Sequence, residues 1–339
     1  MRVLFTPHIE HYTVGLSQEL SKHVKLTLLT TKRFNVKVNQ LVVDLPIPHF
    51  KGFAKWSIFR FLSPLYDVIH TNSSQEGYFS GQFNKLLITE HGWPDPKIVE
   101  ESERYYYLKE REALLRLYEI GVPIVTVSNY SAKMLETMGI KVLRVIHCGI
   151  LPIFVSNVPK SYPQEFRVLF VSRLVSSKEP FIFLEALAMI RGKLNFTAII
   201  RGDGPLRNSI EKWIHTNKME KHIVMMGRIP FEKLPDLYNS CSIYVHTCSK
   251  EPFGLSILEA MGSGLPVIVP GNGGAYEVAG EAALTFKPQD PSDLAEKLLS
   301  LVYDAELYEK LSKKSLERAR RFTWEKAARE YLEVYKEIA

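Results

Sequence analysis

The sequence predicts an α/β protein with two doubly wound domains. Short continuous runs of Val, Ile and Leu alternate with longer amphipathic stretches along most of the 339 residues. Continuous apolar runs are typical of parallel strands that are buried on both faces, and the helical stretches between them supply the crossover connections. A chain of this length also fits about two domains of ~100–200 residues each.

The first half of the chain contains a series of strand-like runs. They are Arg2–Thr6, Lys25–Thr30, Gln40–Asp44, Asp67–Thr71, Lys85–Thr89, Pro123–Val127 and Leu143–His147. Amphipathic stretches such as Val14–Lys22 and Ile98–Ile120 lie between them and favour helices. This alternation predicts one parallel sheet with helices on both faces.

The alternation breaks at Ile150–Glu165, which contains three prolines together with Ser and Asn. Such a composition is typical of a linker between domains. We therefore expect an N-terminal domain over residues 1–155 and a C-terminal domain over residues 156–323.

The alternation then resumes in the second half. The expected strands are Phe166–Val171, Asn195–Arg201, His222–Met226, Ser242–His246 and Pro266–Pro270. The stretch from Pro291 to Ala339 is helical in pattern, and Thr323 is a suitable N-cap for a last helix over residues 324–339. We expect this helix to cross back to the first domain. Two such domains would leave a cleft between them, and ligands of open α/β sheets bind beyond the carboxyl ends of the strands.

Charge and cysteine content narrow the class of protein. The chain has 43 Lys and Arg against 37 Asp and Glu, a net charge of +6 that suits a nucleic acid, an anionic membrane or a phosphorylated ligand. No RNA-binding, zinc or helix-turn-helix signature is present, so we expect no nucleic-acid partner. The three cysteines, Cys148, Cys241 and Cys248, follow no metal-binding spacing and favour a reduced, cytoplasmic protein. No apolar run reaches the ~18 residues of a membrane span, and the N-terminus does not resemble a signal peptide.

The loop after Phe166–Val171 carries two cations. Arg173 and Lys178 lie five residues apart before a helix whose first turn contains Pro180. Two cations beside a helix N-terminus form a good site for an anion, phosphate in particular. The alternative is a pair of solvated surface charges.

The next loop, Gly202-Asp203-Gly204-Pro205, follows a strand and precedes a helix. Glycines there allow close approach of a ligand to the backbone, or they form a plain turn. The third glycine of a dinucleotide-binding fingerprint is missing, and the chain has no phosphate-binding GxxxxGK[ST] motif.

A third segment, Glu251-Pro-Phe-Gly-Leu-Ser-Ile-Leu-Glu259, runs from a loop into a helix that we expect to start near residues 254–256. Free N–H groups at that start would point towards a ligand. Glu259 would present a carboxylate that accepts hydrogen bonds from sugar hydroxyls. The alternative is a glutamate that is satisfied by its own neighbours.

Residues 49–62, HFKGFAKWSIFRFL, interleave basic and aromatic side chains. The basic residues are Lys51, Lys55 and Arg60, and the aromatic ones are Phe50, Phe53, Trp56, Phe59 and Phe61. A basic, aromatic amphipathic helix suits peripheral contact with an anionic membrane. The alternative is a helix with core aromatics and solvated lysines.

EPFGLSILE resembles the E-x7-E motif of retaining glycosyltransferases of family 4, the glycosyl transferases group 1, which have the GT-B fold. Five further segments resemble this family in order: VSRLVSSKEPFIFLEAL, RGDGPL, MGRIPFEKLPDLYNSCSIYVHTC, AMGSGLPVIVPGNGGAYEV and FTWEKAAREYLEVYKEI. The resemblance covers roughly residues 165–339. It implies two Rossmann-like domains that face each other across a cleft, with the acceptor on the N-terminal side and a nucleotide-sugar donor bound by the C-terminal domain.

The resemblance also implies roles for individual residues. Arg173 and Lys178 would hold the donor diphosphate, Glu259 the ribose and Glu251 the transferred sugar. The remaining donor contacts would come from Gly202, Gly227, Arg228, Ile229, Phe253, Gly254, Leu255 and Ser256. His91, in a segment that resembles a family strand end, would act near the reacting centre together with Glu251, Arg173 and Lys178.

The implied activity is a retaining hexosyltransferase. It would move a hexose-type sugar from a donor such as a UDP- or GDP-sugar to a hydroxyl of a glycan, a lipid-linked sugar or a small molecule. No metal or cofactor is implied, and the chain has no Asp-x-Asp motif. The N-terminal loop lacks the family's GGxER pattern. Two alternatives therefore stay open: a non-catalytic nucleotide-sugar-binding subunit, and a GT-B sugar-nucleotide epimerase or hydrolase.

Overall fold

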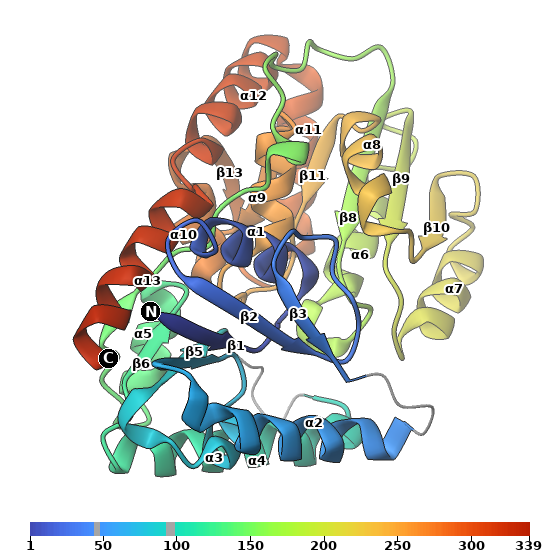
Figure 1. Ribbon diagram of the computed structural model, residues 1–339. Helices are drawn as coiled ribbons and strands as arrows, with labels where there is room; N and C mark the ends of the chain where they lie inside the picture. Colours follow the sequence, from blue (N-terminus) through green and yellow to red (C-terminus); the bar gives the residue numbers. More distant parts are fainter. Residues whose placement is uncertain (44–47, 93–98) are drawn as a thin grey trace. The chain divides into compact units, whose positions relative to one another are not determined.

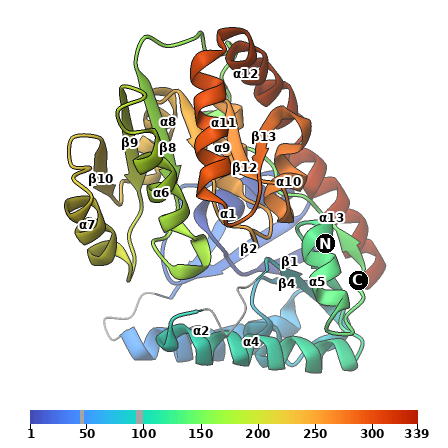
Figure 2. The same cartoon turned by 180° about the vertical axis from the view of Figure 1, so that it is seen from behind.

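The computed structural model describes residues 1–43, 48–92 and 99–339, without the side chains of residues 48–53 and 102. The chain divides into two compact units (Figures 1 and 2). The first unit comprises Met1–Pro96, Glu101–Gly149 and Thr323–Ala339, and the second comprises Lys97–Glu100 and Ile150–Phe322. The main division therefore falls at Ile150, a few residues before the expected boundary, and the chain returns to the first unit at Thr323.

A parallel sheet forms the centre of the first unit. Its strands, in spatial order, are β3 (Asn39–Val42), β2 (Lys25–Thr30), β1 (Arg2–Phe5), β4 (Val68–Thr71), β5 (Leu86–Glu90), β6 (Ile124–Thr126) and β7 (Arg144–Val145). The order reverses between β1 and β4, as in a doubly wound sheet. Each of these strands overlaps a run expected from the sequence, although the end of the run Gln40–Asp44 lies outside the described residues.

Helices cover both faces of this sheet. They are α1 (Glu10–Leu20), α2 (Pro48–Leu62), α3 (Ser74–Ser80), α4 (Glu101–Glu119), α5 (Asn129–Glu136) and α13 (Trp324–Ile338). α3 packs against both α2 and α4, whereas α1 packs against α13 (Figures 1 and 2). The first unit thus takes its last helix from the C-terminal end of the chain.

Buried hydroxyl and imidazole groups fasten α13 to the sheet. His70 on β4 contacts the Tyr335 hydroxyl through Nδ1 at 2.6 Å and the Thr89 hydroxyl through Nε2 at 2.7 Å. The Tyr331 hydroxyl lies 3.0 Å from both the Thr89 and Tyr12 hydroxyls. Because all of these groups are buried, their mutual hydrogen bonds remove the cost of leaving polar atoms unsatisfied. At the start of α13, the Thr323 side chain accepts a hydrogen bond from Lys326 N, as an N-cap does.

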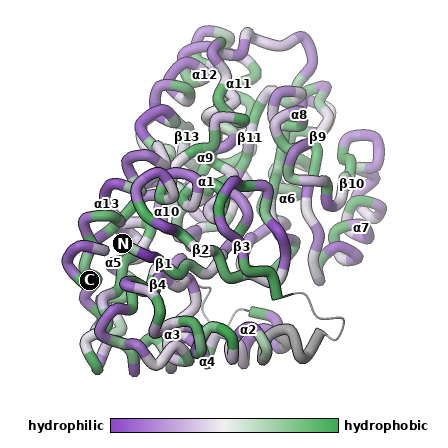
Figure 3. Tube along the Cα trace, in the orientation of Figure 1, coloured by the Kyte–Doolittle hydropathy of each residue, from purple (hydrophilic) through white to green (hydrophobic). Residues whose placement is uncertain are grey.

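A second parallel sheet forms the centre of the second unit. Its strands, in spatial order, are β10 (Ile223–Gly227), β9 (Phe196–Arg201), β8 (Phe166–Val171), β11 (Ile243–Val245), β12 (Val267–Pro270) and β13 (Ala283–Phe286). Figure 3 shows that β8, β9 and β11 are largely hydrophobic. β13 was not expected from the sequence, because this edge strand is four residues long and has no continuous apolar run.

The helices of the second unit complete the doubly wound arrangement. They are α6 (Pro180–Ile190), α7 (Arg207–Thr216), α8 (Leu234–Asn239), α9 (Leu255–Gly262), α10 (Gly273–Ala279), α11 (Pro291–Tyr303) and α12 (Ala305–Ala319). α11 packs on α6, and α12 packs on α9. The segment expected to be a linker is in part a piece of this unit: Ile150 N donates to Phe322 O, and Ser156 N donates to Gly262 O at 2.7 Å.

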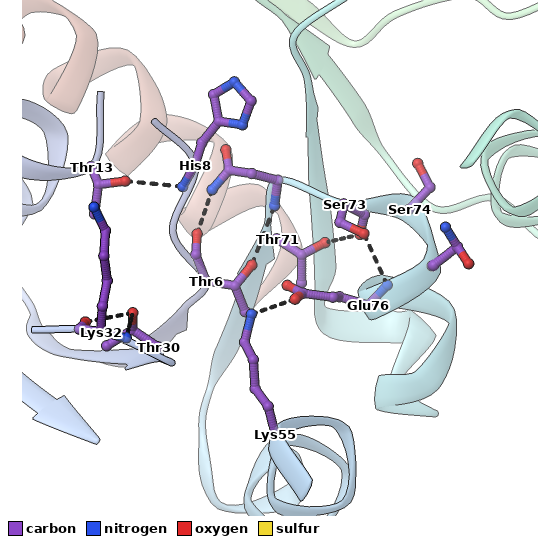
Figure 4. A network of polar contacts seen from close by, with 12 residues as sticks. Thr6, His8, Thr13, Thr30, Lys32, Lys55, Thr71, Ser73, Ser74 and Glu76 are labelled. Atoms are coloured by element: carbon purple, nitrogen blue, oxygen red, sulfur yellow. Dashed lines mark hydrogen bonds and ion pairs between the residues drawn. The ribbon is translucent and has the colours of Figure 1, made fainter. Parts of the chain in front are cut away.

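Residues 49–62 form most of α2, and the structure corrects part of the expectation for them. Lys55 is buried and forms an ion pair with Glu76, shown in Figure 4, and Phe59 is buried in the core. Neither side chain faces solvent, because both lie on the side of the helix that packs against the unit. Phe61, in contrast, is 78% exposed. The side chains of residues 49–53 lie outside the described residues. Nowhere in the described chain is there a helix with the length and hydropathy needed to cross a bilayer.

Candidate functional site

The candidate site lies at the carboxyl ends of β8 and β11, where the strand order of the second sheet reverses. β8 leads to β9 on one side, whereas β11, the other neighbour of β8, is reached only after β10. Helices leaving the two strands diverge at such a point, and this divergence opens a place for a ligand. The loop with Arg173 and Lys178 follows β8, and the loop with Glu251 follows β11.

Direct hydrogen bonds join these two loops. The Thr247 hydroxyl donates to Lys178 O at 2.8 Å, and Cys248 Sγ donates to Ser177 O at 3.0 Å. Glu179 accepts from both the backbone N and the hydroxyl of Ser249, at 3.1 and 2.7 Å. The two loops therefore form one layer, which fixes the position of Lys178 relative to Glu251.

Lys178 and Glu251 form a partly buried ion pair. Lys178 Nζ lies 2.6 Å from Glu251 Oε2, and His246 Nε2 lies 3.0 Å from the same oxygen. Burial by itself raises the pKa of Glu251, but Lys178 and His246 outweigh burial and hold that pKa well below its usual range. Burial likewise lowers the pKa of Lys178, and Glu251 reverses this effect so that the net pKa is raised. The site thus holds a fixed ammonium and a fixed carboxylate.

His246, Cys248 and Glu251 bring three metal-ligand atoms within 4.8 Å of one another. Their chemistry does not favour a divalent cation. The Lys178 ammonium already contacts the Glu251 carboxylate, and burial raises the pKa of the Cys248 thiol to about 12, so that the thiolate form is disfavoured. The group is better described as part of the ion-pair network.

The start of α9 supplies free backbone N–H groups beside this network. Gly254 is the N-cap with φ of +94°, and a Cβ there would lie 2.6 Å from Ile257 Cδ1. Only glycine fits this position without strain. The next residues, Leu255 and Ser256, form the first turn, and the Tyr244 hydroxyl donates to Ser256 Oγ at 2.8 Å. The turn is therefore held rigidly against β11.

Glu259 lies on α9, as the sequence predicts, and is buried. Its Oε2 accepts a hydrogen bond from the Tyr238 hydroxyl at 2.8 Å. This contact orients the carboxylate, and burial together with Glu259 raises the pKa of Tyr238 well above its usual value. The side chain of Phe253 is buried and lies edge-on to Phe322, so among its atoms only the backbone remains for a ligand.

The other predicted donor residues follow β9 and β10. Gly202 has φ of +151°, its N donates to Gly227 O at 3.0 Å, and a Cβ on it would lie 1.8 Å from Ser172 O. The glycine is thus required by the close approach of two strand ends. Ile229 O accepts from Arg201 Nη2 at 3.2 Å, and the exposed Arg228 lies 3.6 Å from Asp203 through Nε.

His91 belongs to the first unit, where it follows β5. Its Nε2 donates to Asn72 Oδ1 at 2.7 Å, and its ring stacks on His8 with centroids 3.9 Å apart. Burial, with the nearby charges of His8 and His70, lowers the pKa of His91 well below its usual value. Figure 4 shows the adjacent ends of β1 and β4, where His8 N donates to the Thr13 hydroxyl. These residues form a polar group of their own at the point where the order of the first sheet reverses.

The structure thus brings Lys178 and Glu251 into contact. Arg173 is exposed, and its positive charge is close enough to lower the pKa of Lys178 against the larger effect of Glu251. Sequence reasoning missed His246, Glu179, Ser249 and Tyr238. A signal existed for His246, which is the last residue of the expected strand Ser242–His246. None existed for the Glu179–Ser249 contact, because its residues are 70 positions apart.

Solved structures identify the class of fold. Sucrose-phosphate synthase from Thermosynechococcus elongatus superposes with a TM-score of 0.80 at 20% identity, over 99% of this chain and 98% of that one. HepE from Anabaena, solved in complex with UDP-glucose, gives 0.80 at 18% identity over 99% and 100%. The chain has the GT-B fold of these glycosyltransferases.

Sequence comparison identifies the family. Residues 154–318 match the glycosyl transferases group 1 model, and this part of the chain belongs to that family. An uncharacterized glycosyltransferase of Methanocaldococcus jannaschii is 33% identical over 173 residues, which are 50% of this chain and 48% of that protein. The sulfoquinovosyl transferase of Arabidopsis thaliana is 31% identical over 171 residues, 49% of this chain and 32% of that protein. The matched segment thus spans about half or less of these relatives.

Proposed function

We propose that the protein is a retaining hexosyltransferase that takes its sugar from a nucleoside-diphosphate donor. The observation that carries this proposal is the Lys178–Glu251 pair, which lies near Arg173 and the start of α9. The pair lies where the strand order of the second sheet reverses, in the segment that matches the group 1 model. Cations, free N–H groups and an oriented carboxylate at one site match a ligand with both phosphate and hydroxyl groups.

The departure of the diphosphate is the step that this site would assist. Negative charge grows on the leaving diphosphate while positive charge develops on the sugar carbon, and fixed positive charge aimed at the leaving group stabilises that state. Arg173, Lys178 and the N–H groups of Leu255 and Ser256 would supply it without a metal ion. Glu251 would orient the sugar. In a retaining transfer the acceptor hydroxyl attacks from the face that the diphosphate leaves, and the leaving phosphate oxygen would take the hydroxyl proton.

The rest of the donor would lie along the neighbouring strand ends. The Glu259 carboxylate, oriented by Tyr238, would accept hydrogen bonds from the ribose hydroxyls. Backbone groups of Gly227–Ile229 would face the base. Because HepE was solved with UDP-glucose and with UDP and glucose, we propose a UDP- or GDP-hexose as donor. A hydroxyl of a glycan, a lipid-linked sugar or a small molecule would be the acceptor. His91 would act near the reacting centre.

A thermal-shift panel of UDP, GDP, ADP and their hexoses tests donor binding, since a ligand that binds the folded state raises the melting temperature. Transfer is then measured with the donor that binds best. Glu251→Gln and Arg173→Ala should each reduce transfer by orders of magnitude with the fold intact, and His91→Ala is measured alongside. Lys297→Ala, in a half-buried ion pair with Asp293 on α11, is the matched control.

Each outcome separates the proposal from its alternatives. Binding without transfer to any acceptor would indicate a non-catalytic nucleotide-sugar-binding subunit. Conversion of the donor without an acceptor would indicate an epimerase or hydrolase. A flat response across the panel, or normal transfer by Glu251→Gln, would overturn the proposal.

We also propose a cytoplasmic location with peripheral membrane contact through α2. All three cysteines are free, as suits a reducing compartment. Ile58, Phe61 and Leu65 are exposed at the end of α2 and just beyond it, and the α2 sequence contains basic but no acidic residues. Phe61→Ser should weaken sedimentation with phosphatidylglycerol vesicles, whereas Tyr303→Ser, at a residue 69% exposed in the second unit, should not. Equal sedimentation of both variants would contradict the contact.

A further inference from the structure

We propose that His246 is a positioning residue that holds the Glu251 carboxylate in its working orientation when the donor diphosphate claims Lys178. This inference rests on the proposed function, because it assigns Glu251 to the sugar and Lys178 to the diphosphate. It adds a residue that neither the sequence motifs nor the family resemblance singled out.

The contacts at Glu251 fall on one of its two oxygens. Lys178 Nζ and His246 Nε2 lie 2.6 and 3.0 Å from Oε2. Within the part of the chain that the structure describes, no hydrogen bond is made to Oε1. Oε2 is therefore the anchored atom, and Oε1 is the atom that can accept a hydrogen bond from a sugar hydroxyl.

His246 is well suited to be the permanent anchor. His246 is 3% exposed, and its backbone N donates to Ile268 O at 2.9 Å at the end of β11. The side chain is therefore already fixed, and no conformational entropy is lost there when a ligand binds. His246 Nε2 is a buried polar atom that makes no aligned hydrogen bond within the described residues, although it lies 3.0 Å from Oε2. We assign the ring proton to Nε2 because this atom faces a carboxylate, and a small turn of the carboxylate would complete the hydrogen bond. Nδ1 lies 3.5 Å from the oxygen of the Tyr244 hydroxyl, whose proton is donated to Ser256 Oγ.

Lys178 is the contact that changes when a donor arrives. Its ammonium would then be shared between the Glu251 carboxylate and the diphosphate, which weakens its hold on Oε2. A buried carboxylate that loses part of its counter-charge raises the free energy of the folded protein, and it can rotate because one of its contacts is weakened. The carboxylate can then turn into alignment with the His246 N–H, which lies 3.0 Å from Oε2 and holds this oxygen in place at that moment.

Two variants isolate the imidazole donor. His246→Leu removes it, and His246→Gln restores an N–H near the position of Nε2. Because a hydrogen bond to a charged group is lost, His246→Leu should lower kcat/KM for the hexose donor by about 10- to 100-fold, while the Kd of the free nucleoside diphosphate stays within about threefold. His246→Gln should recover most of the loss. His222→Leu, at the partly buried residue that precedes β10, is the control and should change neither value.

A double-mutant cycle asks whether His246 acts through Glu251. In the Glu251→Gln background, His246→Leu should cause little further loss, because the carboxylate that it positions is gone. Full additivity would overturn the inference. So would equal losses in the Leu and Gln variants together with weakened nucleoside-diphosphate binding, since that result describes a merely structural histidine.

A measurement without substrate separates this inference from the proposed function. In ¹⁵N-labelled wild-type protein, the His246 Nε2 proton should appear as a slowly exchanging downfield resonance that disappears in Glu251→Ala. Absence of the resonance from the wild type would overturn the contact even if transfer is observed. Its presence with a flat nucleotide panel would instead overturn the proposed function, and with it the assignment of Oε1 to a sugar.

Discussion

Lys178 and Glu251, 73 residues apart in the chain, meet in a 2.6 Å ion pair at the reversal point of the second sheet. The pair has less exposure than a surface salt bridge, at 26% for the Lys178 side chain and 12% for that of Glu251. Its energetic weight is therefore set by burial as well as by attraction. Removal of either partner leaves a charge with little access to water.

The first prediction concerns this pair. Lys178→Met keeps the length of the side chain and removes its charge, so the unfolding free energy at pH 7 should fall by about 2–3 kcal/mol, below the range for fully buried pairs because Lys178 is partly exposed. The double variant Lys178→Met/Glu251→Gln should recover most of the loss. Urea unfolding measures both. Lys297→Met, in an i,i+4 pair with Asp293 that is more exposed, at 34% and 26%, should lose under about 1 kcal/mol, and equal losses at the two lysines would contradict the prediction.

The pH dependence of the pair follows from the direction of the Glu251 pKa shift. The folded-state pKa lies below the usual value, so the stabilisation is fully present above the usual carboxylate pKa. It should be lost as the pH falls from that value towards the lower folded-state pKa. The stability difference between wild type and Glu251→Gln should therefore be constant from pH 6 to 8 and shrink below pH 4.

A second prediction concerns Glu90, for which the sign is opposite. This carboxyl is 4% exposed, accepts from Gly92 N and Thr126 Oγ1, and burial raises its pKa to about 7. The folded state thus holds a proton that the unfolded state releases, so stability falls as the pH rises from about 4.5 to 7. Glu90→Gln should remove this slope. It should stabilise the protein by about 2–3 kcal/mol at pH 8 and change little at pH 4.5.

Denaturation midpoints of wild type and Glu90→Gln across pH 4.5–8 measure this effect. Glu112→Gln is the control, because that carboxyl has a lowered pKa and lies in an exposed pair with Lys109. If the denaturation midpoints of wild type and Glu90→Gln changed in parallel with pH, ionisation of Glu90 would cost no folding free energy, and the prediction would be wrong.

A third prediction concerns the close contact of α1 with α13. A Cβ on Gly15 would lie 2.1 Å from Trp324 Nε1. Ala is favoured over Gly in a helix by roughly 1 kcal/mol, yet Gly15→Ala should destabilise by about 1–3 kcal/mol because the indole is packed and has no room to move. Gly271→Ala, where the nearest atom would be 3.6 Å away, is the control. Hydrogen exchange should show faster opening of α13 in Gly15→Ala alone.

The fourth prediction concerns the buried hydroxyl of Tyr331. It lies 3.0 Å from the Tyr12 and Thr89 hydroxyls, so Tyr331→Phe leaves buried polar groups short of a partner. We expect a loss of about 1–3 kcal/mol in thermal or urea unfolding. The hydroxyl of Tyr303 is exposed and donates to Lys193 O, and Tyr303→Phe should cost under about 1 kcal/mol. Similar losses in both variants would show that the network adds little.

The sequence by itself determined most of the strands and the motifs that lie within a single loop and helix. β2 and β8 coincide with the expected runs Lys25–Thr30 and Phe166–Val171, because strands buried on both faces require continuous apolar sequence. The Thr323 cap was equally readable, since it depends on neighbours within a single turn. The motif with Glu251, Gly254 and Glu259 could be recognised for the same reason, as its residues lie within one loop and helix.

Only the tertiary structure decided which distant side chains meet. The pairing of β8 with β11 brings Glu179 to Ser249 and Lys178 to Glu251, and it places His246 on the same oxygen as Lys178. Packing also put Lys55 inside the first unit, where a charge pattern alone suggested a solvated helix face. Such contacts depend on strand order and helix placement, which join residues tens of positions apart, whereas periodicity reports only the structure of a single element.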